Sequence, residues 1–477
     1  AQRLVLQGIQ FTPEYNTYQT VAEVKEARPA APPQALAVGG YKAIVYIFLN
    51  GGMDSWNMLP PYPGGCPAEN DIYAEYAGIR RGVALNDTDM LELSGITGHH
   101  TKCTSFGLHK ELSILKDWFD AGDASFIANS GLLSKLVDKS NYRSETAVQL
   151  FDHNGMTIQS NRLDLGKDAP GSGVLGRISE AIKDSHAVNI YSVSGNQPAT
   201  NGRPGVDISP LTLSSERMKR FNPTDYPSNP QASMEMEDLI ASLNTASGTH
   251  SSLMGETWSQ IALGAMGQHD QLFSALDGAE PTTEFPDNEL GNKLKSIATV
   301  MKQTHNGIIR DNRQIFVADM DGFDTHSFLI SSLEEKFTII NDALTAFEEE
   351  LKRLGLWSST TIVQLSEFAR TLDPNGGETG DGTGQGSDHA WGGVNFIAGG
   401  PVKGGQILGE YPNDFSSKSP ITLDRGRLIP TTPHDSMWNA VAKWFGVDES
   451  EMDAVLPQRS NFPPSDIYDV ATLYVTS

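Results

Sequence analysis

The sequence predicts an α/β fold in which helices cover both faces of a mostly parallel central sheet. Short β-branched or apolar runs recur along the chain and are typical of buried strands. They occupy residues 43–49, 124–128, 188–192, 314–318, 360–365 and 394–398. Segments with helical periodicity separate these runs, and strands that alternate with helices favour a parallel sheet covered on both sides.

The strongest helical pattern follows the predicted strand at 314–318. Apolar side chains recur there at alternating spacings of four and three residues, at Leu333, Phe337, Ile340, Leu344, Phe347, Leu351 and Leu354. We expect this stripe to pack on the sheet, because one apolar face of a helix needs a covering layer. Further helices are predicted at 108–119, near 234–245, 253–275 and 289–304, and from about 434 to 445.

The chain divides into an N-terminal arm or linker, residues 1–40, and one main domain, residues 41–477. The arm is irregular and ends at Gly39-Gly40, after a Pro/Ala-rich stretch. Because it lacks a core, we expect it to lie along the main domain or to mediate self-assembly by reaching a neighbouring subunit. Pro, Ser and Asn cluster at 222–232, and the helices around them predict a helical insertion at about 200–300.

Composition excludes several classes of protein. The chain has 477 residues and a formal net charge of −24. It has no Lys/Arg stripe, so we expect no nucleic-acid partner. The apolar run at 43–49 is far shorter than the ~20 residues that cross a bilayer, so we expect no transmembrane segment. An acidic chain repels anions at long range, so any anion site must be locally positive.

The two cysteines and the first residue bear on the compartment. Cys66 and Cys103 stand in no CxxC motif, which argues against a thiol zinc site. The sequence leaves open whether they form a disulfide or remain two thiols. The chain begins at Ala1 rather than Met, and we interpret this as processing of a longer precursor.

Acids and histidines follow the ends of three predicted strands. Asp54 follows the first strand and two glycines, and Asp324 and His326 follow the strand at 314–318. Glu367 follows the strand at 360–365. Ligands collect at the carboxyl ends of strands in α/β folds, and carboxylate with imidazole suits zinc, manganese or iron. Alone, Asp54 is equally explained as a turn residue that caps a helix.

The segment after Glu367 adds three more candidates. Arg370 lies close to Glu367 and would bind an oxyanion bidentately, although a surface Glu–Arg pair explains the same spacing. A Gly-rich loop, residues 373–389, is expected to deliver Asp388 and His389 to the site. Acids within this loop faintly suggest calcium, but the EF-hand spacing is absent. The predicted metal ligands are therefore Asp54, Asp324, His326, Glu367, Asp388 and His389.

Four motifs in order resemble domain-of-unknown-function family 1501, a branch of the alkaline phosphatase/sulfatase superfamily. They are Gly-Gly-x-Asp-x-x-Asn at 51–57, Gly-[Trp/Phe]-Asp-Thr-His at 322–326, Ser-Glu-Phe-[Gly/Ala]-Arg-Thr at 366–371, and Gly-[Thr/Ser]-Asp-His at 386–389. The resemblance spans roughly residues 41–446. It implies an alkaline-phosphatase-like sandwich and an exported protein, secreted to the periplasm or the outside, often by the twin-arginine route.

The resemblance also implies two adjacent divalent metal ions, which would be zinc, manganese or calcium. It assigns one ion to Asp324, His326 and His389, and the other to Asp54, Asp152 and Glu367. Two ions would clamp the attacking and leaving oxygens of phosphoryl or sulfuryl transfer. The implied substrate is a phosphate or sulfate ester.

One motif departs from the family pattern. Relatives often carry Phe-Ser-His-Asn at a helix start, where the Ser is a candidate nucleophile, whereas this chain has Asp152 at that position and His153 after it. We place Asp152, His153 and Arg370 at the catalytic position, with Asp152 as a metal ligand and metal-bound water in place of serine. Ser140 and Ser144 are alternative nucleophiles, although helix capping explains both.

The sequence thus supports two functions. The first is an exported metal-dependent hydrolase of phosphate or sulfate esters. The second is a catalytically inactive, secreted structural or adhesive protein on the same scaffold. The Asp at position 152, the acidic composition and the Pro-rich arm fit the second function.

Overall fold

The computed structural model describes residues 40–98, 103–147, 149–165, 171–204, 210–213, 230–244, 253–376 and 384–475. The chain forms two compact units, one of Ala1–Gln34 with Arg217–Glu280 and one of Ala35–Glu216 with Pro281–Ser477. Apart from Gly40, the predicted arm lies outside the described residues and stays a prediction. In the first unit, the described elements are the helices α8 (Pro230–Asn244) and α9 (Leu253–Leu276).

The second unit is built on a nine-stranded, mostly parallel sheet in the order β10-β4-β9-β8-β1-β7-β5-β6, with β11 paired to β4. Strand β9 runs antiparallel to β4 and β8, and the other neighbours are parallel. The strands are β1 (Lys42–Leu49), β4 (Ala124–Gly131), β5 (Val188–Ser192), β6 (Leu211–Thr212), β7 (Arg313–Met320), β8 (Thr360–Leu365), β9 (Gly393–Ala398), β10 (Gln406–Leu408) and β11 (Thr432–Pro433). The predicted fold class is confirmed.

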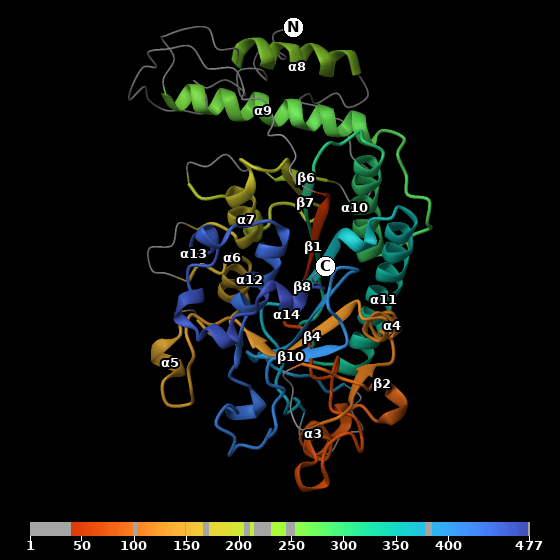
Figure 1. Cartoon of the computed structure of the whole chain (residues 1–477), viewed down its shortest axis with the longest axis vertical. Coiled ribbons are helices and arrows are strands. Elements are labelled where there is room, and N and C mark those ends of the chain that lie inside the picture. The colour runs from red at the N-terminus through yellow and green to blue at the C-terminus, as the bar shows by residue number, and fades with distance from the viewer. Residues whose placement is uncertain are drawn as a thin grey trace. The chain divides into compact units, whose positions relative to one another are not determined.

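Helices cover both faces of this sheet (Figure 1). On one side lie α7 (Val174–Ile182) and α12 (His434–Phe445), whose apolar side chains share a core with Ile44, Tyr46 and Phe48 of β1. On the other side lie α10 (Glu289–His305) and α11 (Leu329–Arg353), with α10 packed on β7 and on α11. Alternate residues of a strand point to opposite faces, so β1, which is buried from Ala43 to Leu49, supplies both cores.

The remaining helices and strands are short. They are α3 (Ile72–Arg80), α4 (Ser113–Ala121), α5 (Tyr142–Glu145), α6 (His153–Arg162), α13 (Met452–Val455), α14 (Val470–Leu473), and the antiparallel pair β2 (Met90–Leu93) and β3 (Phe106–His109). Among the described residues, no helix has the length and apolar character that crossing a bilayer requires.

The predicted helix at 108–119 is wrong over its first residues. Leu108 and His109 belong to β3 and pair with Leu91 and Met90 of β2, and α4 begins only at Ser113. Gly107 lets the Met90 side chain pack closely on β3, because a Cβ there would lie 2.2 Å from the Met90 sulfur and would force that side chain to move. Tertiary pairing has overridden the local helical period.

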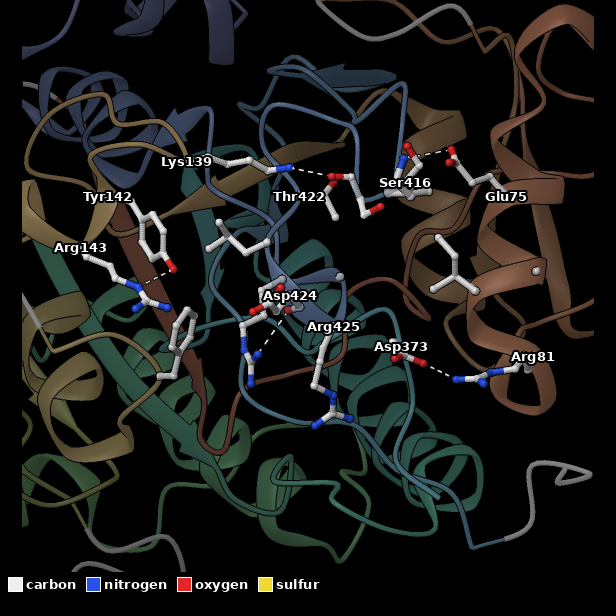
Figure 2. Close-up of a pocket in the computed structure, with 18 of the residues that line it drawn as sticks. Glu75, Arg81, Lys139, Tyr142, Arg143, Asp373, Ser416, Thr422, Asp424 and Arg425 are labelled. Atoms are coloured by element: carbon white, nitrogen blue, oxygen red, sulfur yellow. Dashed lines mark hydrogen bonds and ion pairs between the residues drawn. The ribbon is translucent and has the colours of Figure 1, made fainter. Parts of the chain in front are cut away.

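A cavity of about 1230 Å³ opens between α3, α5 and the loop that contains residues 415–427 (Figure 2). Glu75, Arg81, Tyr142, Phe415 and Arg427 are among the residues that line it. All of its lining belongs to the second unit.

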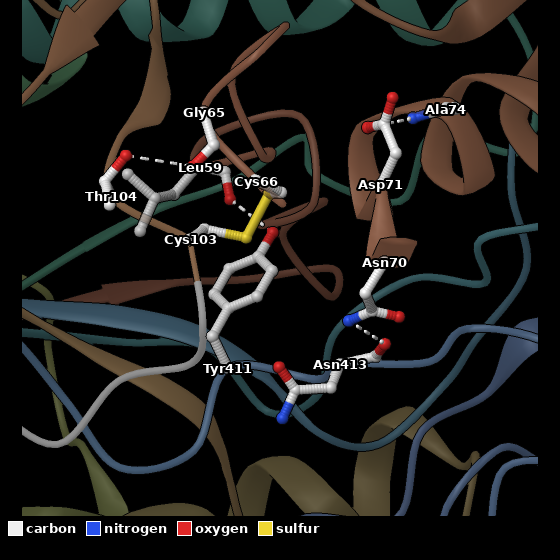
Figure 3. Close-up of a disulfide and its surroundings, with 10 residues drawn as sticks. All are labelled: Leu59, Gly65, Cys66, Asn70, Asp71, Ala74, Cys103, Thr104, Tyr411 and Asn413. Atoms are coloured by element: carbon white, nitrogen blue, oxygen red, sulfur yellow. Dashed lines mark hydrogen bonds between the residues drawn. A yellow bond between two sulfur atoms is a disulfide. The ribbon is translucent and has the colours of Figure 1, made fainter. Parts of the chain in front are cut away.

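Cys66 and Cys103 form a disulfide, so the question that the sequence left open is settled by the structure (Figure 3). The two cysteines are 37 positions apart in the sequence, and the bond closes the loop between them. Thr104 beside it donates its backbone N–H to Gly65 O at 2.7 Å. Disulfides persist in oxidising compartments and are rare in the cytosol.

Removing this disulfide should destabilise the protein. For a loop of 37 residues, the chain-entropy model gives a loss of about 4 kcal/mol for the Cys66→Ser/Cys103→Ser variant. Denaturant unfolding with and without reductant measures the effect. The parent should lose stability on reduction and the variant should not; equal sensitivity of the two proteins would contradict a structural role for the bond.

Asp435 should make stability fall as pH rises. It is fully buried in the first turn of α12, and burial raises its pKa to about 7. Between its unfolded pKa of about 4 and about 7, only the unfolded state releases the proton, which removes up to about 1.4 kcal/mol of stability per pH unit. Asp435→Asn should remove this slope.

Urea unfolding from pH 4 to pH 8 tests this expectation. The quantity compared is the difference in unfolding free energy between the Asp435→Asn variant and the parent at each pH. The difference is needed because burial lowers the pKa of neighbouring His434 to about 4, so His434 contributes the opposite slope. Parallel stability curves for the two proteins would contradict the assignment to Asp435.

Candidate metal centre

The loops that follow β1, β7 and β8 meet at one edge of the sheet. Strand β1 lies between β7 and β8 and is parallel to both, so their carboxyl ends are adjacent. The glycine pair of the first loop permits close contact: a Cβ on Gly51 would lie 2.4 Å from Asp324 N, and one on Gly52 would lie 2.2 Å from the Phe368 ring. Both glycines have positive φ, 117° and 77°, which side chains disfavour.

Arg370 fastens these loops together from a fully buried position. Its guanidinium donates to Gly52 O at 2.9 Å, Gly51 O at 3.0 Å, Ser387 O at 3.0 Å and Phe323 O at 3.3 Å. It also pairs with the Asp324 carboxylate. With most of its donors directed at the protein, Arg370 is a clamp on the loops, and its predicted role as an oxyanion ligand stays a prediction.

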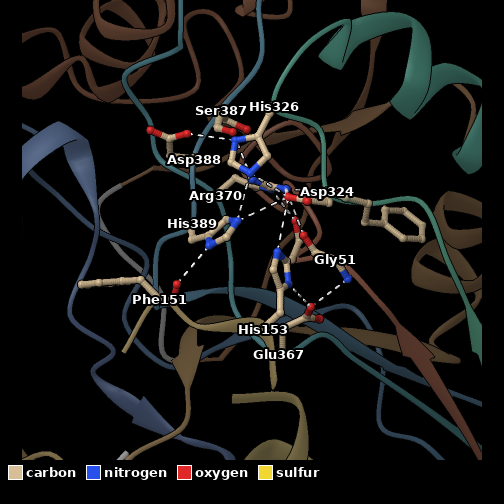
Figure 4. A network of polar contacts seen from close by, with 12 residues as sticks. Gly51, Phe151, His153, Asp324, His326, Glu367, Arg370, Ser387, Asp388 and His389 are labelled. Atoms are coloured by element: carbon tan, nitrogen blue, oxygen red, sulfur yellow. Dashed lines mark hydrogen bonds and ion pairs between the residues drawn. The ribbon is translucent and has the colours of Figure 1, made fainter. Parts of the chain in front are cut away.

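Three histidines surround the Asp324 carboxylate (Figure 4). The Nδ1 atom of each histidine contacts an oxygen on the side of the ring that faces away from Asp324. His153 Nδ1 faces Glu367 Oε1 at 2.9 Å, His326 Nδ1 faces Asp388 Oδ1 at 2.9 Å, and His389 Nδ1 faces Phe151 O at 3.0 Å. An acceptor at Nδ1 places the ring proton there and leaves a lone pair on Nε2.

The three Nε2 atoms converge on one oxygen. Asp324 Oδ1 lies 3.0 Å from His326 Nε2 and 3.4 Å from each of His153 Nε2 and His389 Nε2. The Nε2 atoms of His326 and His389 are 3.0 Å apart. His153 Nε2 is buried and has no hydrogen-bond partner among the described residues.

The charges of the centre follow from its neighbours. Partial burial raises the pKa of Asp324, but the hydrogen bond and charge of Arg370, with His326 and His153, hold it below its usual value. Burial, and then Arg370, lower the pKa of His326, and burial likewise lowers that of His389. Both rings are therefore neutral at neutral pH. The hydrogen bond to Glu367 raises the pKa of His153.

Glu367 and Asp388 lie behind the histidines and not beside Asp324. Glu367 is buried and also accepts from Gly51 N at 2.8 Å, whereas Asp388 accepts from Asn375 Nδ2 at 3.1 Å and pairs with Arg425. Both were predicted as direct ligands. Their contacts make them orienting partners of His153 and His326 instead.

Asp54 and Asp152 have other partners. Asp54 is fully buried and pairs with Arg80 at 2.5 Å, and it accepts from Asn57 N at 3.3 Å. Asp152 caps α6 by accepting from Gly155 N at 2.7 Å. The predicted cluster of Asp54, Asp152 and Glu367 is therefore not assembled, because the first two carboxylates are engaged locally and His153 meets Glu367.

His153, Asp324 and His389 form a group of metal-ligating side chains with all ligand atoms within 4.8 Å of one another, and His326 Nε2 lies 3.0 Å from both Asp324 Oδ1 and His389 Nε2. Sequence reasoning placed His153 at the catalytic position but did not make it a ligand. The signal for it was present, because Asp152 is a favoured helix cap and the next residue starts α6 at the sheet edge. The alternative nucleophiles Ser140 and Ser144 make local bonds, to Asp138 Oδ1 and Asn141 O.

A family model described as "Protein of unknown function (DUF1501)" matches residues 283–424. The resemblance to DUF1501 is confirmed. The matched segment carries three of the four motifs, whereas the glycine pair and His153 lie before it. The match to DUF1501 thus includes Asp324, His326 and His389. The fourth side chain of the centre, His153, lies outside the matched segment. No curated protein matches the chain significantly.

Two solved structures illustrate the wider similarity. The PsFucS1 sulfatase from Pseudoalteromonas sp. is 8% identical, with 98% of this chain and 74% of that chain covered and a TM-score of 0.31. An alkaline phosphatase from the Antarctic bacterium TAB5 is 10% identical, with 78% and 95% covered and a TM-score of 0.28. Similarity at this level transfers no activity, so the functional conclusion depends on the residues of the centre.

Replacing Arg370 by Lys should destabilise the protein although the charge is kept. A lysine lacks the planar fork, and each buried carbonyl left unpaired costs about 1–3 kcal/mol. We expect a loss of about 2–4 kcal/mol in urea unfolding. Arg81→Lys is the matched control, because Arg81 makes a half-exposed ion pair with Asp373 and should change stability by less than about 1 kcal/mol. Equal losses in both variants would contradict the clamp.

Proposed function

We propose that His153, Asp324, His326 and His389 bind a divalent transition-metal ion, zinc foremost, and that the protein is an exported hydrolase of phosphate or sulfate esters. The observation that carries this proposal is the convergence of three Nε2 atoms on Asp324 while every Nδ1 is held from behind. Metal-binding histidines almost always have such a partner at the other ring nitrogen.

The contact between His326 and His389 supports a cation. Both rings are neutral and both present Nε2 lone pairs, yet these atoms are 3.0 Å apart. With each ring proton held at Nδ1 by the acceptor behind it, two Nε2 lone pairs at this distance repel. A cation between them converts the repulsion into ligation, and it also gives the buried Nε2 of His153 a partner.

The spacing of the atoms fits a small ion. Tetrahedral ligands at about 2.0–2.1 Å from zinc lie about 3.3–3.4 Å from one another. Asp324 Oδ1 is 3.0–3.4 Å from the three Nε2 atoms. Imidazole with carboxylate suits zinc and manganese better than calcium, which takes oxygen ligands.

The chemistry follows from this donor set. A bound ion would polarise an ester oxygen and lower the pKa of a water. Asp324 stays ionised because Arg370 and the histidines stabilise its charge, and Glu367 and Asp388 fix the orientation of two of the rings. Arg370 is engaged by the backbone carbonyls of the loops. We therefore expect other cationic side chains to bind a substrate anion.

The inactive-scaffold function remains the second candidate, and one observation favours it. Asp152, at the position of the family's candidate serine, only caps α6, so the described centre offers no side-chain nucleophile there. The disulfide fits an exported protein under either function.

Metal content separates the two functions. Elemental analysis of the purified protein should find a bound zinc or manganese ion, which His153→Ala or His389→Ala should remove. His305→Ala is the control, since His305 is exposed at the end of α10. Glu367→Gln should weaken metal binding about 10–100-fold by releasing His153. Asp152→Ser should leave it unchanged, since serine also caps helices.

Activity is the second readout. Aryl phosphates and aryl sulfates are assayed with the parent protein and added zinc, manganese or calcium, and turnover should disappear in His389→Ala but persist in His305→Ala. Absence of bound metal in the parent would contradict the proposed centre. Bound metal without turnover of either ester class would favour the scaffold.

A further inference from the structure

The cavity introduced above opens beside the metal centre. Three of its lining residues are bonded directly to the centre's side chains or backbone. Phe151 O accepts from His389 Nδ1, Arg427 Nε donates to His389 O at 2.7 Å, and Arg425 pairs with Asp388 behind His326. The cavity and the centre therefore share bonded residues, so a molecule in the cavity lies next to the contacts that support His389 and His326.

The cavity is positive in a chain of net charge −24. Its lining contains five cations, Arg81, Lys139, Arg143, Arg425 and Arg427, against the three acids Glu75, Asp373 and Asp424. Arg81 and Arg425 are neutralised by Asp373 and Asp388. Figure 2 shows Lys139 and Arg143, which come from the segment at α5, on one side of the opening, and Arg425, which comes from the loop of residues 415–427.

Three of these cations have no carboxylate partner within ion-pair distance in the described parts of the chain. Lys139 Nζ donates to Ser417 O at 3.0 Å, Arg143 Nε donates to Tyr142 Oη at 2.9 Å, and Arg427 bonds the carbonyls of His389 and Asp424. An ammonium has three donors and a guanidinium five. Each side chain therefore keeps donors for a ligand.

The size and the lining define the ligand further. A pocket for a drug-sized molecule spans about 300–1,000 Å³, and this cavity of about 1230 Å³ is larger. Ser140, Ser416 and Thr422 add hydroxyl groups, and Tyr142 and Phe151 add ring faces. Separated cations in a wide, hydroxyl-rich cavity suit several small anions on one flexible molecule better than one compact ester.

We propose that this cavity binds an oligomeric substrate with several sulfate or phosphate groups, which Lys139, Arg143 and Arg427 hold while one ester reaches the metal centre. The inference rests on the proposed function for the place of reaction, but binding in the cavity does not require turnover. The local positive charge offsets the long-range repulsion that the acidic chain exerts on anions.

Binding to the full chain is measured by calorimetry at low ionic strength. Sucrose octasulfate and inorganic tripolyphosphate are the two probes, and inorganic sulfate is the single-anion reference. The test variant is Lys139→Gln/Arg143→Gln, which leaves the metal centre intact. The control is Lys116→Gln/Lys352→Gln, which removes the same charge from the exposed ion pairs on α4 and α11.

We expect at least one probe to bind more tightly than inorganic sulfate. The test variant should lose about 10–100-fold in affinity through two missing charge-assisted contacts, and the control should lose less than about threefold through screened charge alone. The probe that binds more tightly identifies sulfate or phosphate as the preferred anion. His389→Ala should retain probe binding, which separates a failure of the metal centre from a failure of this inference.

Three results would overturn the proposal. One is equal affinity of the test variant and the control for both probes. The second is binding of inorganic sulfate as tight as that of the probes, which indicates a site for one anion. The third is loss of probe binding in His389→Ala, which places the probe on the metal centre instead of in the cavity.

Discussion

The guanidinium of Arg370 determines how the candidate metal centre is built. Parallel strands bring the loops after β1, β7 and β8 to one edge, but these loops expose backbone carbonyls that repel one another. Arg370 offers donors to carbonyls from Gly51, Gly52, Phe323 and Ser387, and it pairs with Asp324. One buried cation thus satisfies several acceptors at once and fixes the carboxylate around which the histidines gather.

The histidines are positioned by what lies behind them. Glu367, Asp388 and Phe151 O each face an Nδ1 atom and come from three separate segments. Because the rings are held in this way, the Nε2 atoms are directed inward before any ion binds. Such preorganisation lowers the cost of binding a ligand, and it explains why three imidazoles share so small a space.

Much of this arrangement was predictable from the sequence. The apolar runs located β1, β5, β7, β8 and β9, since buried parallel strands read as continuous apolar segments. Asp324 and His326 were expected at the carboxyl edge of the sheet because they follow a buried strand, and the Gly-rich loop was expected to bring His389 to the same edge. The error at 108–119 arose because β3 is stabilised by pairing with β2, which no local period reveals.

Other roles depend on contacts that sequence spacing does not contain. Asp54 has the right position for a ligand, but Arg80, 26 residues along the chain, takes its carboxylate. Glu367 and Asp388 lie close to the centre, as predicted for ligands. The orientations of the His153 and His326 rings show that these carboxylates contact the Nδ1 atoms instead. His153 was assigned to catalysis beside Asp152, and its position next to Asp324 depends on how α6 points its first residue at Glu367.

The backbone around the Gly-rich loop has a consequence for how this chain tolerates change. Arg370 and His389 form an antiparallel bridge, Thr371 N donates to Asp388 O at 2.9 Å, and Asn375 N donates to Gly386 O at 2.7 Å. These rungs close the loop at its base, so His389 is held independently of the number of residues beyond the last rung. A change in length at residues 377–383 therefore leaves every one of these rungs in the sequence, and the position of His389 does not depend on how long that stretch is.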